Sequence, residues 1–526
     1  MSTQAGSSSA VAAPHTAVSG RPGTTSKAWW DGSGGVFNPT GRNIFLIGIG
    51  GCGMSGLARM LRGRGAIVSG SDAYASNFTE SLTGEGVAVE LDQTKPLPEA
   101  CDLVIASAAI KPDHPQLLEA DRRGIPHLNY AEALGRCMLG RTGVCVAGTH
   151  GKSTTTAMLG CVLAAAGLDP GVIVGANCPQ LAALGGSGGF RLGADAIPAG
   201  SLAGEPGLLV VEACEFNRSF HNYRPRIAAI TSVEADHLDI FGSLDEVVKA
   251  FADFAKLLPP RGKDGETGGV LLIAHECAHR TRLTAGLLCD VQTIGYSPSA
   301  DWSVQYDPRS RRTGLVRKGE GLVAAWVTQM PGEHNAMNAA TAAALAILSG
   351  ADSDAVGRTL SAFTGLERRM QLLGERRLPG PRAGTVRVYD DYGHHPTEVA
   401  STLRALRDFE RPQERGGRLI CVFQPHQHSR TRFLLDEFAT AFGEADMVIV
   451  PHIYFVRDSE IEKTRVSAAD LVDRLRQRGV QAMHLYPFDA IVEALEVVCK
   501  PEDVVVVMGA GPVDSVAKGF LKGGKS

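Results

Sequence analysis

The chain has 526 residues, enough for about three domains of ordinary size. Its 44% hydrophobic and 21% charged residues are typical of a soluble globular protein, and its net charge of −4 gives no drive toward nucleic acid or an anionic membrane. No run of residues approaches the roughly 18 apolar positions of a membrane span, so we expect no span.

The start of the chain and the cysteine spacing give two more expectations. Residues 1–40 are rich in Ser, Gly, Ala, Thr and Pro, lack the pattern of a signal peptide, and predict a disordered tail. The pair Trp29 and Trp30 has no explanation in such a tail. The 11 cysteines are scattered singly, without a C-x-x-C pair, which indicates free thiols in a reducing compartment and a cytoplasmic protein.

The first block, residues 41–140, begins with a strand, a Gly-rich turn and a helix. Residues 44–49 predict a buried strand, and residues 66–72 predict a second strand that ends in Asp72. The turn satisfies G-x-G-x-x-G through Gly48, Gly50 and Gly53. With an acid about 20 residues further on, the pattern taken alone indicates NAD and a nicotinamide-dependent oxidoreductase. Any diphosphate suits such a turn, and a purely structural glycine turn is a further alternative.

The second block, residues 141–364, opens with the most informative stretch of the chain. Residues 144–147 predict a buried strand, and residues 155–166 predict a helix. Between them, residues 148–154 form a loop that reads G-T-H-G-K-S-T. Backbone N–H groups and the helix dipole at such a loop attract a polyphosphate.

Two side chains of this loop suit a nucleotide. Lys152 supplies a point charge, and the Ser153 hydroxyl can bind Mg²⁺. The strict P-loop pattern has a glycine where this chain has Val146. The loop is therefore predicted to be a variant P-loop that binds a nucleoside triphosphate.

Polar residues follow two later strands of this block. Glu212 ends one predicted strand, and Asp236 and His237 follow a strand predicted at residues 227–231. The carboxyl ends of parallel strands meet at one edge of a sheet, so these side chains are expected near Lys152. Carboxylate oxygens suit Mg²⁺, and a neutral histidine can join them, so Glu212 and His237 are predicted to be metal ligands.

An Ala-rich helix is predicted at residues 339–348, and His334 and Asn338 stand four apart at its entry. Residues with that spacing lie on one face of a helix. They could contact a base or a phosphate, or could cap the helix.

Strands and helices alternate again in the third block, residues 365–526, which predicts a third α/β unit. Arg368 and Arg369 near its start could clamp phosphate or be solvated. Histidines cluster in the turns after two predicted strands, beside Arg430 and Arg432. A second substrate would bind at these strand ends.

Together these stretches resemble the Mur ligases, and within that family the branch that adds alanine. The likeness covers about residues 42–513. The segments that carry it are residues 48–56, 148–154, 234–237, 334–338, 368–369, 390–396 and 423–430. The string D-D-Y-G-H-H-P at residues 390–396 and the P-loop are together highly specific.

The resemblance implies an α/β protein of three domains. Residues 41–140 would form a Rossmann-like UDP-sugar-binding domain, and residues 141–364 a central ATP-binding domain with a P-loop ATPase-type parallel sheet. Residues 365–526 would form a Rossmann-like domain for the incoming amino acid. This reading replaces NAD at the first glycine turn with UDP-N-acetylmuramate.

The resemblance also implies the reaction. The muramate carboxylate attacks the γ-phosphate of ATP to give an acyl phosphate and ADP, and the L-alanine amine then displaces phosphate. The substrates would be UDP-N-acetylmuramate and L-alanine, and the cofactors ATP and Mg²⁺. Neither nucleic acid nor a membrane is implied, and the oligomeric state is left open.

Carried over to matching positions, the resemblance implies five sets of residues. ATP would bind at Gly148, Thr149, His150, Gly151, Lys152, Ser153, Thr154, His334, Asn335, Asn338 and Arg369. UDP-sugar would bind at Gly48, Gly50, Gly51, Gly53, Met54, Ser55, Asp72 and Ser107. The amino acid would bind at Tyr392, His394, His426 and Arg430. The metal ligands would be Ser153, Glu212 and His237. The catalytic residues would be Lys152, His237, Arg369, His394 and Arg430.

The chain departs from the family pattern at three positions. Cys214 and Asn217 stand where the family has acids, and Gln427 stands where arginine is common. Three alternatives to the alanine-adding ligase remain. They are a ligase of the same fold that attaches a preformed murein peptide, an NAD-dependent oxidoreductase, and a catalytically silent ATP-binding module.

Overall fold

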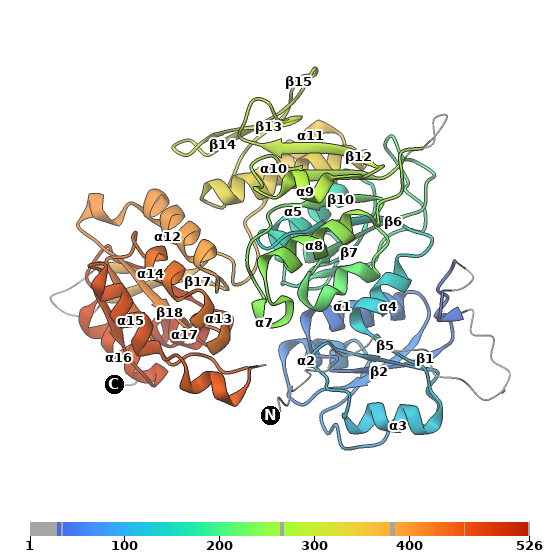
Figure 1. Cartoon of the computed structure of the whole chain (residues 1–526), viewed down its shortest axis with the longest axis horizontal. Helices are drawn as coiled ribbons and strands as arrows, with labels where there is room; N and C mark the ends of the chain where they lie inside the picture. The colour runs from blue at the N-terminus through green and yellow to red at the C-terminus, as the bar shows by residue number, and fades with distance from the viewer. Residues whose placement is uncertain (1–28, 33–34, 263–267, 379–383, 457, 524–526) are drawn as a thin grey trace, which may run out of the picture.

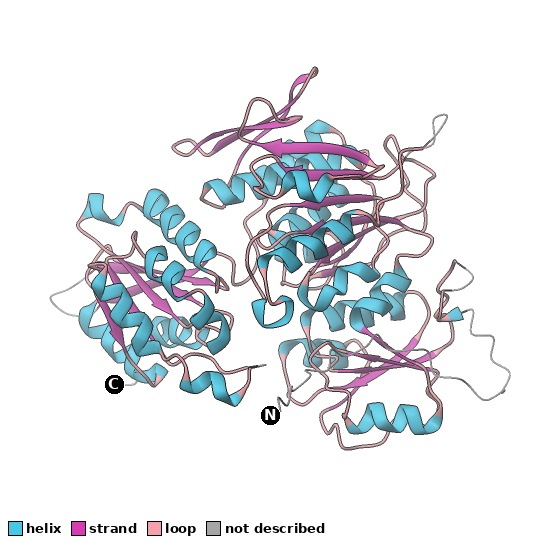
Figure 2. Ribbon diagram, viewed as in Figure 1, coloured by secondary structure: helices cyan, strands magenta, loops and turns pink. Residues whose placement is uncertain are grey.

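The computed structural model of the chain describes residues 29–32, 35–262, 268–378, 384–456 and 458–523. Three sheets divide the chain into three α/β domains, which confirms the predicted fold class (Figures 1 and 2). Among the residues described, no helix combines the length and the apolar character that crossing a bilayer demands.

The N-terminal domain is a parallel sheet of order β3-β2-β1-β4-β5 with helices on both faces. Its elements are β1 (Asn43–Ile47), α1 (Cys52–Gly63), β2 (Ile67–Ser71), α2 (Asn77–Gly84), β3 (Ala88–Glu90), β4 (Leu103–Ala106), α3 (Pro115–Arg123), β5 (His127–Asn129) and α4 (Tyr130–Cys137). The predicted strand–turn–helix therefore corresponds to β1, the glycine turn and α1.

The central domain has a ten-stranded sheet of order β15-β14-β13-β12-β11-β10-β6-β9-β7-β8. The adjacent strands β13, β12, β11, β10, β6, β9 and β7 pair in parallel, while β8, β14 and β15 are antiparallel additions. Its first elements are β6 (Thr142–Ala147), α5 (Lys152–Ala165), β7 (Gly171–Ile173), α6 (Pro179–Ala183), β8 (Phe190–Arg191), β9 (Leu208–Ala213), β10 (Ile227–Ile230), α7 (Leu238–Phe241) and α8 (Leu244–Ala255). The remainder are β11 (Val270–Ala274), α9 (Arg280–Thr284), β12 (Asp290–Gly295), β13 (Trp302–Asp307), β14 (Arg312–Arg317), β15 (Gly321–Val327), α10 (Glu333–Leu348) and α11 (Ser353–Ala362).

The C-terminal domain has a six-stranded sheet of order β16-β17-β21-β18-β19-β20, in which only β16 is antiparallel. Its first elements are β16 (Gln371–Leu378), β17 (Gly384–Asp391), α12 (Pro396–Glu410), β18 (Leu419–Phe423), α13 (His428–Phe433), α14 (Leu435–Ala441) and β19 (Met447–Val450). The remainder are α15 (Ala468–Gln477), β20 (Ala482–His484), α16 (Phe488–Val498), β21 (Val504–Met508) and α17 (Asp514–Lys522). Helices α12, α14 and α15 cover one face of the sheet, and α16 and α17 cover the other.

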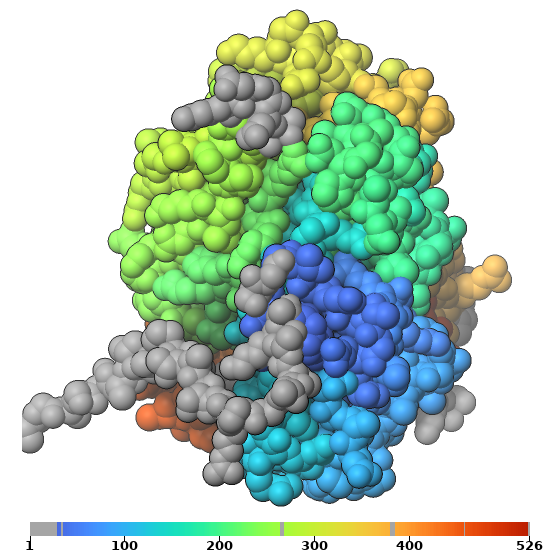
Figure 3. Space-filling model, turned by 90° about the vertical axis from the view of Figure 1, so that its right-hand side faces the viewer, coloured from blue at the N-terminus to red at the C-terminus, as the bar shows by residue number. Residues whose placement is uncertain are grey.

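Strand β6 shows why this chain folds into layers. Val144 and Val146 pack with α5 and α10 on one face of the central sheet. Cys145 and Ala147 point to the other face, because side chains alternate along a strand. That second core runs on into α1 and α4 of the N-terminal domain, so these two domains share one hydrophobic core. Figure 3 shows the blue N-terminal residues packed directly against the green central domain.

The end of the predicted tail is packed rather than disordered. Residues 1–28 lie outside the described residues, but the Trp29 ring stacks on Phe37 with centroids 6.4 Å apart. The guanidinium of Arg42 lies 4.8 Å from the Trp29 ring, and Trp30 packs on the same core. The prediction of disorder up to residue 40 is wrong here, because large aromatic side chains anchor the segment.

Candidate active site

The phosphate loop connects β6 to α5. The helix begins at Lys152, whereas the sequence predicted its start at residue 155. No side chain caps the helix, so its first backbone N–H groups are left for a ligand. Two positions of the loop have no room for a side chain and therefore require glycine. A Cβ at Gly148 would lie 2.0 Å from Thr231 Oγ1, and a Cβ at Gly151 would lie 2.3 Å from Asn338 Oδ1.

The Lys152 ammonium is held inside this loop. Its Nζ donates to the carbonyl oxygens of Gly148 at 2.5 Å and Thr149 at 3.1 Å, and pairs with Glu215 Oε2 at 3.0 Å. Burial opposes the charge, but Glu215 outweighs it and raises the pKa of Lys152 above its ordinary value. Sequence reasoning does not assign this role to Glu215, whose only signal is its place three residues after Glu212 in the family motif.

The predicted metal ligands fall into two groups. Ser153 Oγ donates to Glu212 Oε1 at 3.0 Å, and Glu212 Oε2 accepts from the Gly175 N–H at 2.9 Å. His237 instead contacts a neighbouring pair. Its N–H donates to Asp236 Oδ1 at 2.7 Å, and its Nδ1 lies 3.5 Å from a guanidinium nitrogen of Arg430. Burial lowers the pKa of His237 and keeps it neutral.

A cleft of about 230 Å³ lies beside the phosphate loop, between the central domain and α12 of the C-terminal domain. Its lining includes seven residues that were predicted to bind ATP, namely His150, Gly151, Thr154, His334, Asn335, Asn338 and Arg369. Burial lowers the pKa of His334 to about 4, so this imidazole is neutral near pH 7. Asn338 Nδ2 donates to Asn335 Oδ1 at 3.4 Å, and the two amides are thereby oriented together. Helix α10 begins before the predicted residue 339, which places His334 and Asn338 within its first turns.

The glycine turn of the N-terminal domain folds on itself. The Gly50 N–H donates to Asp72 Oδ2 at 2.8 Å, and Gly48, with φ of +78°, lies against Ser107. A Cβ at Gly53 would lie 2.8 Å from the Tyr130 hydroxyl oxygen. Asp72 therefore stabilises the turn by accepting from its backbone, whereas the sequence pattern predicted that this carboxylate binds the ligand.

Two further residues predicted at this turn are turned inward. Met54 is 4% exposed and Ser55 is 1% exposed, and Ser55 Oγ donates to the Cys52 carbonyl at 2.9 Å. Both side chains are therefore buried, because the helix starts at Cys52 and directs them toward the core.

The predicted amino-acid residues meet at the carboxyl end of the C-terminal sheet. The ring centroids of Tyr392 and His394 are 5.6 Å apart, and those of His394 and His426 are 5.7 Å apart. Arg430 Nη1 lies 3.1 Å from His426 Nδ1. The Arg369 guanidinium carbon lies 5.2 Å from the Tyr392 ring. These residues come from separate turns, and the fold brings them together.

Arg430 is not free to bind a substrate in this conformation. A guanidinium nitrogen lies 2.9 Å from Asp236 Oδ1, which belongs to the central domain. Burial opposes ionisation of Asp236, but Arg430 outweighs it and lowers the pKa of that carboxyl below its ordinary value. The charge predicted to hold the amino acid is thus paired between domains.

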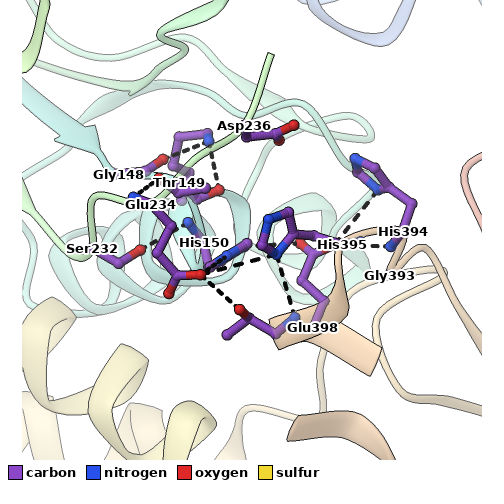
Figure 4. A network of polar contacts seen from close by, with 12 residues as sticks. Gly148, Thr149, His150, Ser232, Glu234, Asp236, Gly393, His394, His395 and Glu398 are labelled. Carbon is purple, nitrogen blue, oxygen red and sulfur yellow. Dashed lines mark hydrogen bonds and ion pairs between the residues drawn. The ribbon is translucent and has the colours of Figure 1, made fainter. Parts of the chain in front are cut away.

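A network of polar contacts joins the phosphate loop to α12 (Figure 4). Ligand atoms of His150, Glu234 and His395 lie within 4.8 Å of one another. His395 Nδ1 accepts from the Thr397 N–H at 3.3 Å, and its Nε2 lies 3.3 Å from the Ala235 carbonyl oxygen. Both nitrogens are thus engaged in hydrogen bonds, and the group is better described as a hydrogen-bonded ion cluster than as a metal site.

The departures from the family pattern have simple structural outcomes. Burial raises the pKa of the Cys214 thiol to about 12, so this residue is neutral beside Glu215. Gln427 is 5% exposed, and its Nε2 donates to the Val456 carbonyl at 3.3 Å. In this conformation Gln427 therefore holds a neighbouring loop.

Comparisons with known proteins agree across the whole described architecture. Three family models match, described as "Mur ligase family, catalytic domain" at residues 43–142, "Mur ligase middle domain" at residues 146–346 and "Mur ligase, glutamate ligase domain" at residues 368–511. The UDP-N-acetylmuramate–L-alanine ligase of Rubrobacter xylanophilus is 37% identical and aligns over 91% of this chain and 99% of its own. The enzyme of that name from Sorangium cellulosum is 36% identical over 92% and 97%.

Two solved structures have a similar fold. The UDP-N-acetylmuramate–alanine ligase of Thermotoga maritima superposes with a TM-score of 0.70 at 23% identity, over 91% of this chain and 98% of that one. A murein peptide ligase from Psychrobacter arcticus superposes with a TM-score of 0.68 at 24% identity, over 92% and 98%. At these identities the structures support the fold alone.

Proposed function

The chain belongs to the Mur ligase family, and from this premise we propose that it joins L-alanine to UDP-N-acetylmuramate at the expense of ATP, in peptidoglycan precursor synthesis. One observation carries the proposal at the level of the site. The cleft beside the phosphate loop and the cluster of Tyr392, His394, His426 and Arg430 both lie at the boundary between the central and C-terminal domains. A phosphate donor and an amine can therefore reach one carboxylate.

ATP would bind with its phosphates at the start of α5. The uncapped N–H groups of that helix and the charged Lys152 would hold the phosphates. Lys152 would exchange its present contacts with the Gly148 and Thr149 carbonyls for phosphate oxygens. Arg369 lines the same cleft and would add a second positive charge there.

The donors at the start of α5 suit a hard divalent cation. The Ser153 hydroxyl and the Glu212 carboxylate lie 3.0 Å apart and offer oxygen ligands of the kind that Mg²⁺ prefers. Neutral His237 would complete the set after a rearrangement near Arg430. Bound Mg²⁺ would neutralise phosphate charge.

The two chemical steps need charge neutralisation first and a base second. The muramate carboxylate attacks the γ-phosphorus, the bond to the β-phosphate oxygen breaks, and ADP leaves. Lys152 and Arg369 stabilise the charge on the transferred phosphoryl group. The alanine amine then attacks the acyl carbon, and inorganic phosphate leaves.

His394 is uncharged and has one ring nitrogen free of hydrogen, so it can accept a proton once the amine has attacked. Burial lowers its pKa to about 4, so the imidazole is neutral near pH 7. Its Nδ1 lies 3.0 Å from the Tyr392 carbonyl oxygen and therefore carries the hydrogen. In that tautomer Nε2 holds a lone pair that can accept a proton from the attacking amine.

The chain's 11 cysteines are all free thiols, which supports a proposal that the protein works in the reducing cytoplasm. Its partners would be the two small-molecule substrates. No feature described above calls for a nucleic acid.

A phosphate-release assay tests the function. With ATP, Mg²⁺ and UDP-N-acetylmuramate, we expect release that depends on L-alanine. Release with a murein tripeptide and none with alanine would favour the peptide-attaching ligase. Tight binding of NADH, with no binding of UDP-N-acetylmuramate, would overturn the ligase assignment of the first domain.

A further inference from the structure

His150 stands between two carboxylates that belong to different domains (Figure 4). Glu234 follows β10 in the central domain, and Glu398 lies in the first turn of α12 in the C-terminal domain. His150 Nε2 is 3.4 Å from Glu234 Oε2, and His150 Nδ1 is 3.5 Å from Glu398 Oε1. One imidazole ring therefore contacts one acid of each domain.

Both acids are ionised at neutral pH. Burial opposes ionisation of Glu234, but His150 outweighs it and lowers the pKa of Glu234 to about 2. The pKa of Glu398 is held well below its ordinary value against burial, by His394, His150 and Arg369. Two like charges this near a common group repel each other unless a cation stands between them.

His150 supplies that cation only when both of its nitrogens carry hydrogen. Burial opposes its protonation, but the carboxylates of Glu234 and Glu398 outweigh burial and raise the pKa of His150 to about 9. Arg369 is a further cation beside Glu398, its Nη1 lying 3.9 Å from Glu398 Oε1. The pKa values of His395 and His334 are lowered, chiefly by burial, and Thr397 Oγ1 donates to Glu234 at 2.6 Å.

Glu398 connects this contact to the reacting groups. It accepts from the backbone N–H of His394 at 2.9 Å, and one of its oxygens lies 3.9 Å from Arg369 Nη1. The backbone N–H of His150 donates to Ser232 Oγ at 3.0 Å, which anchors the phosphate-loop backbone at this residue. The same loop that would hold phosphates thus also contacts the helix that orients His394 and Arg369.

We propose that protonated His150 is a positioning residue that holds the C-terminal domain closed over the nucleotide cleft by bridging Glu234 and Glu398. It acts through Glu398 on Arg369 and His394, and it touches neither reacting atom. The link to catalysis rests on the proposed ligase function, whereas the bridge between domains does not. The bridge is one of several polar contacts across this boundary, which also include Asp236 with Arg430 and Glu234 with Thr397.

The sign of the pH dependence follows from the raised pKa. Protonation favours the closed arrangement, so the stabilisation is complete below about pH 6.5, the ordinary value for histidine. It is lost as the pH rises through about 9. The full-length protein should therefore open reversibly in alkaline solution.

Small-angle X-ray scattering on the full chain without nucleotide tests the bridge directly. The wild type is expected to have a larger radius of gyration at pH 10 than at pH 7. His150→Asn is expected to have the larger radius at both values. His452→Asn, at an exposed histidine that pairs with His484 and does not line the cleft, is the matched control and should follow the wild type.

A double variant separates the bridge from mere loss of packing. In His150→Asn/Glu398→Gln one of the two repelling charges is gone, while glutamine can still cap α12. The double variant should be more compact than His150→Asn alone. Equal radii for these two variants, or a wild-type radius for His150→Asn at both pH values, would overturn the proposal.

Kinetics give an independent reading. When part of the protein is open, the apparent affinity for ATP falls in proportion to the closed fraction. His150→Asn should therefore raise the KM for ATP at least about fivefold, a larger change than any fall in kcat. An unchanged KM would count against the bridge. If the wild type shows no alanine-dependent phosphate release, the proposed ligase function is wrong. The scattering measurement would still test whether His150 bridges the two domains.

Discussion

The N-terminal and C-terminal domains meet the central domain in opposite ways. The first boundary, here called the apolar joint, is a continuous hydrophobic core that includes α1, α4 and α8. The second, here called the polar boundary, is made of ion pairs and hydrogen bonds, Asp236 to Arg430, Glu234 to Thr397 and His150 to Glu398. Apolar packing has one good arrangement, whereas ionic contacts can be exchanged for those of a charged substrate.

The two kinds of boundary suit two different tasks, a fixed substrate site at the apolar joint and a reaction site that can open and close at the polar boundary. The apolar joint fixes the glycine turn of the N-terminal domain, where we propose that UDP-sugar binds, relative to the phosphate loop. The polar boundary contains the nucleotide cleft and the cluster around Arg430. Closure over a reaction of charged groups is expected at that boundary, where water must be excluded.

The largest expected effect is at the phosphate side of the polar boundary. Lys152→Ala removes the charge that would hold the phosphates, and we expect alanine-dependent phosphate release to fall about a thousandfold or more. Lys256→Ala, at an exposed lysine paired only with Asp253, is the control and should keep wild-type activity. Undiminished release from Lys152→Ala would mean that the loop is not the phosphate cradle.

The next effect breaks the polar boundary itself. Asp236→Asn leaves the buried Arg430 guanidinium without its partner, which costs about 3 kcal/mol or more while the domains stay closed. The variant should therefore open, as seen in a larger radius of gyration and a lower kcat/KM. Because the Asp236 pKa is depressed, the wild-type contact is present above about pH 4 and is lost on further acidification. Asp253→Asn, at a partly exposed carboxylate that pairs with Lys256, is the control, and a compact, fully active Asp236→Asn would contradict the prediction.

A smaller effect is expected where the apolar joint is tightest. A Cβ at Gly135 in α4 would lie 2.1 Å from the Asn222 carbonyl oxygen of the central domain. Gly135→Ala should lower stability by about 1–3 kcal/mol through overpacking, measured as a lower midpoint of thermal unfolding. Gly84→Ala, at a position with open space, should not lower it. The scattering radius of Gly135→Ala at pH 7 and pH 10 should still change as in the wild type.

The smallest effect concerns the aromatic anchor at the start of the described chain. Trp29→Ala removes the stack on Phe37 and the contact with Arg42, and should cost about 1 kcal/mol. Thermal unfolding of the N-terminal part checks this value. Unchanged unfolding would mean that the Trp29 ring contributes no stability, and kcat should be unaffected in either case.

Sequence reasoning reaches the parallel strands and the phosphate loop because both have strong local signals. The predicted strand at residues 144–147 forms the end of β6. The antiparallel strands β13 to β15 are not predicted, since no turn motif marks them and their pairing depends on the edge of a sheet formed elsewhere. The start of α10 is also missed, because Pro331 and Gly332 are typical of a loop, whereas the helix begins directly after them at Glu333.

Within the candidate site, residue types are better predicted than partners. Seven predicted nucleotide residues line one cleft, and four predicted amino-acid residues form one cluster. The pairing of Lys152 with Glu215 and of Arg430 with Asp236 is not predicted. Charges meet according to distances across domains, and spacing along the chain does not encode those distances.

The sequence by itself determined the class of fold, the phosphate loop and the family, because glycines, a lysine and β-branched strands act through local geometry. Only the tertiary structure decided what those groups contact. In the folded protein Asp72 accepts a hydrogen bond from the backbone of its own turn, and Met54 and Ser55 are buried. The tertiary structure also placed His150 between acids of two domains. The physical reason is that burial and charge pairing depend on which surfaces meet.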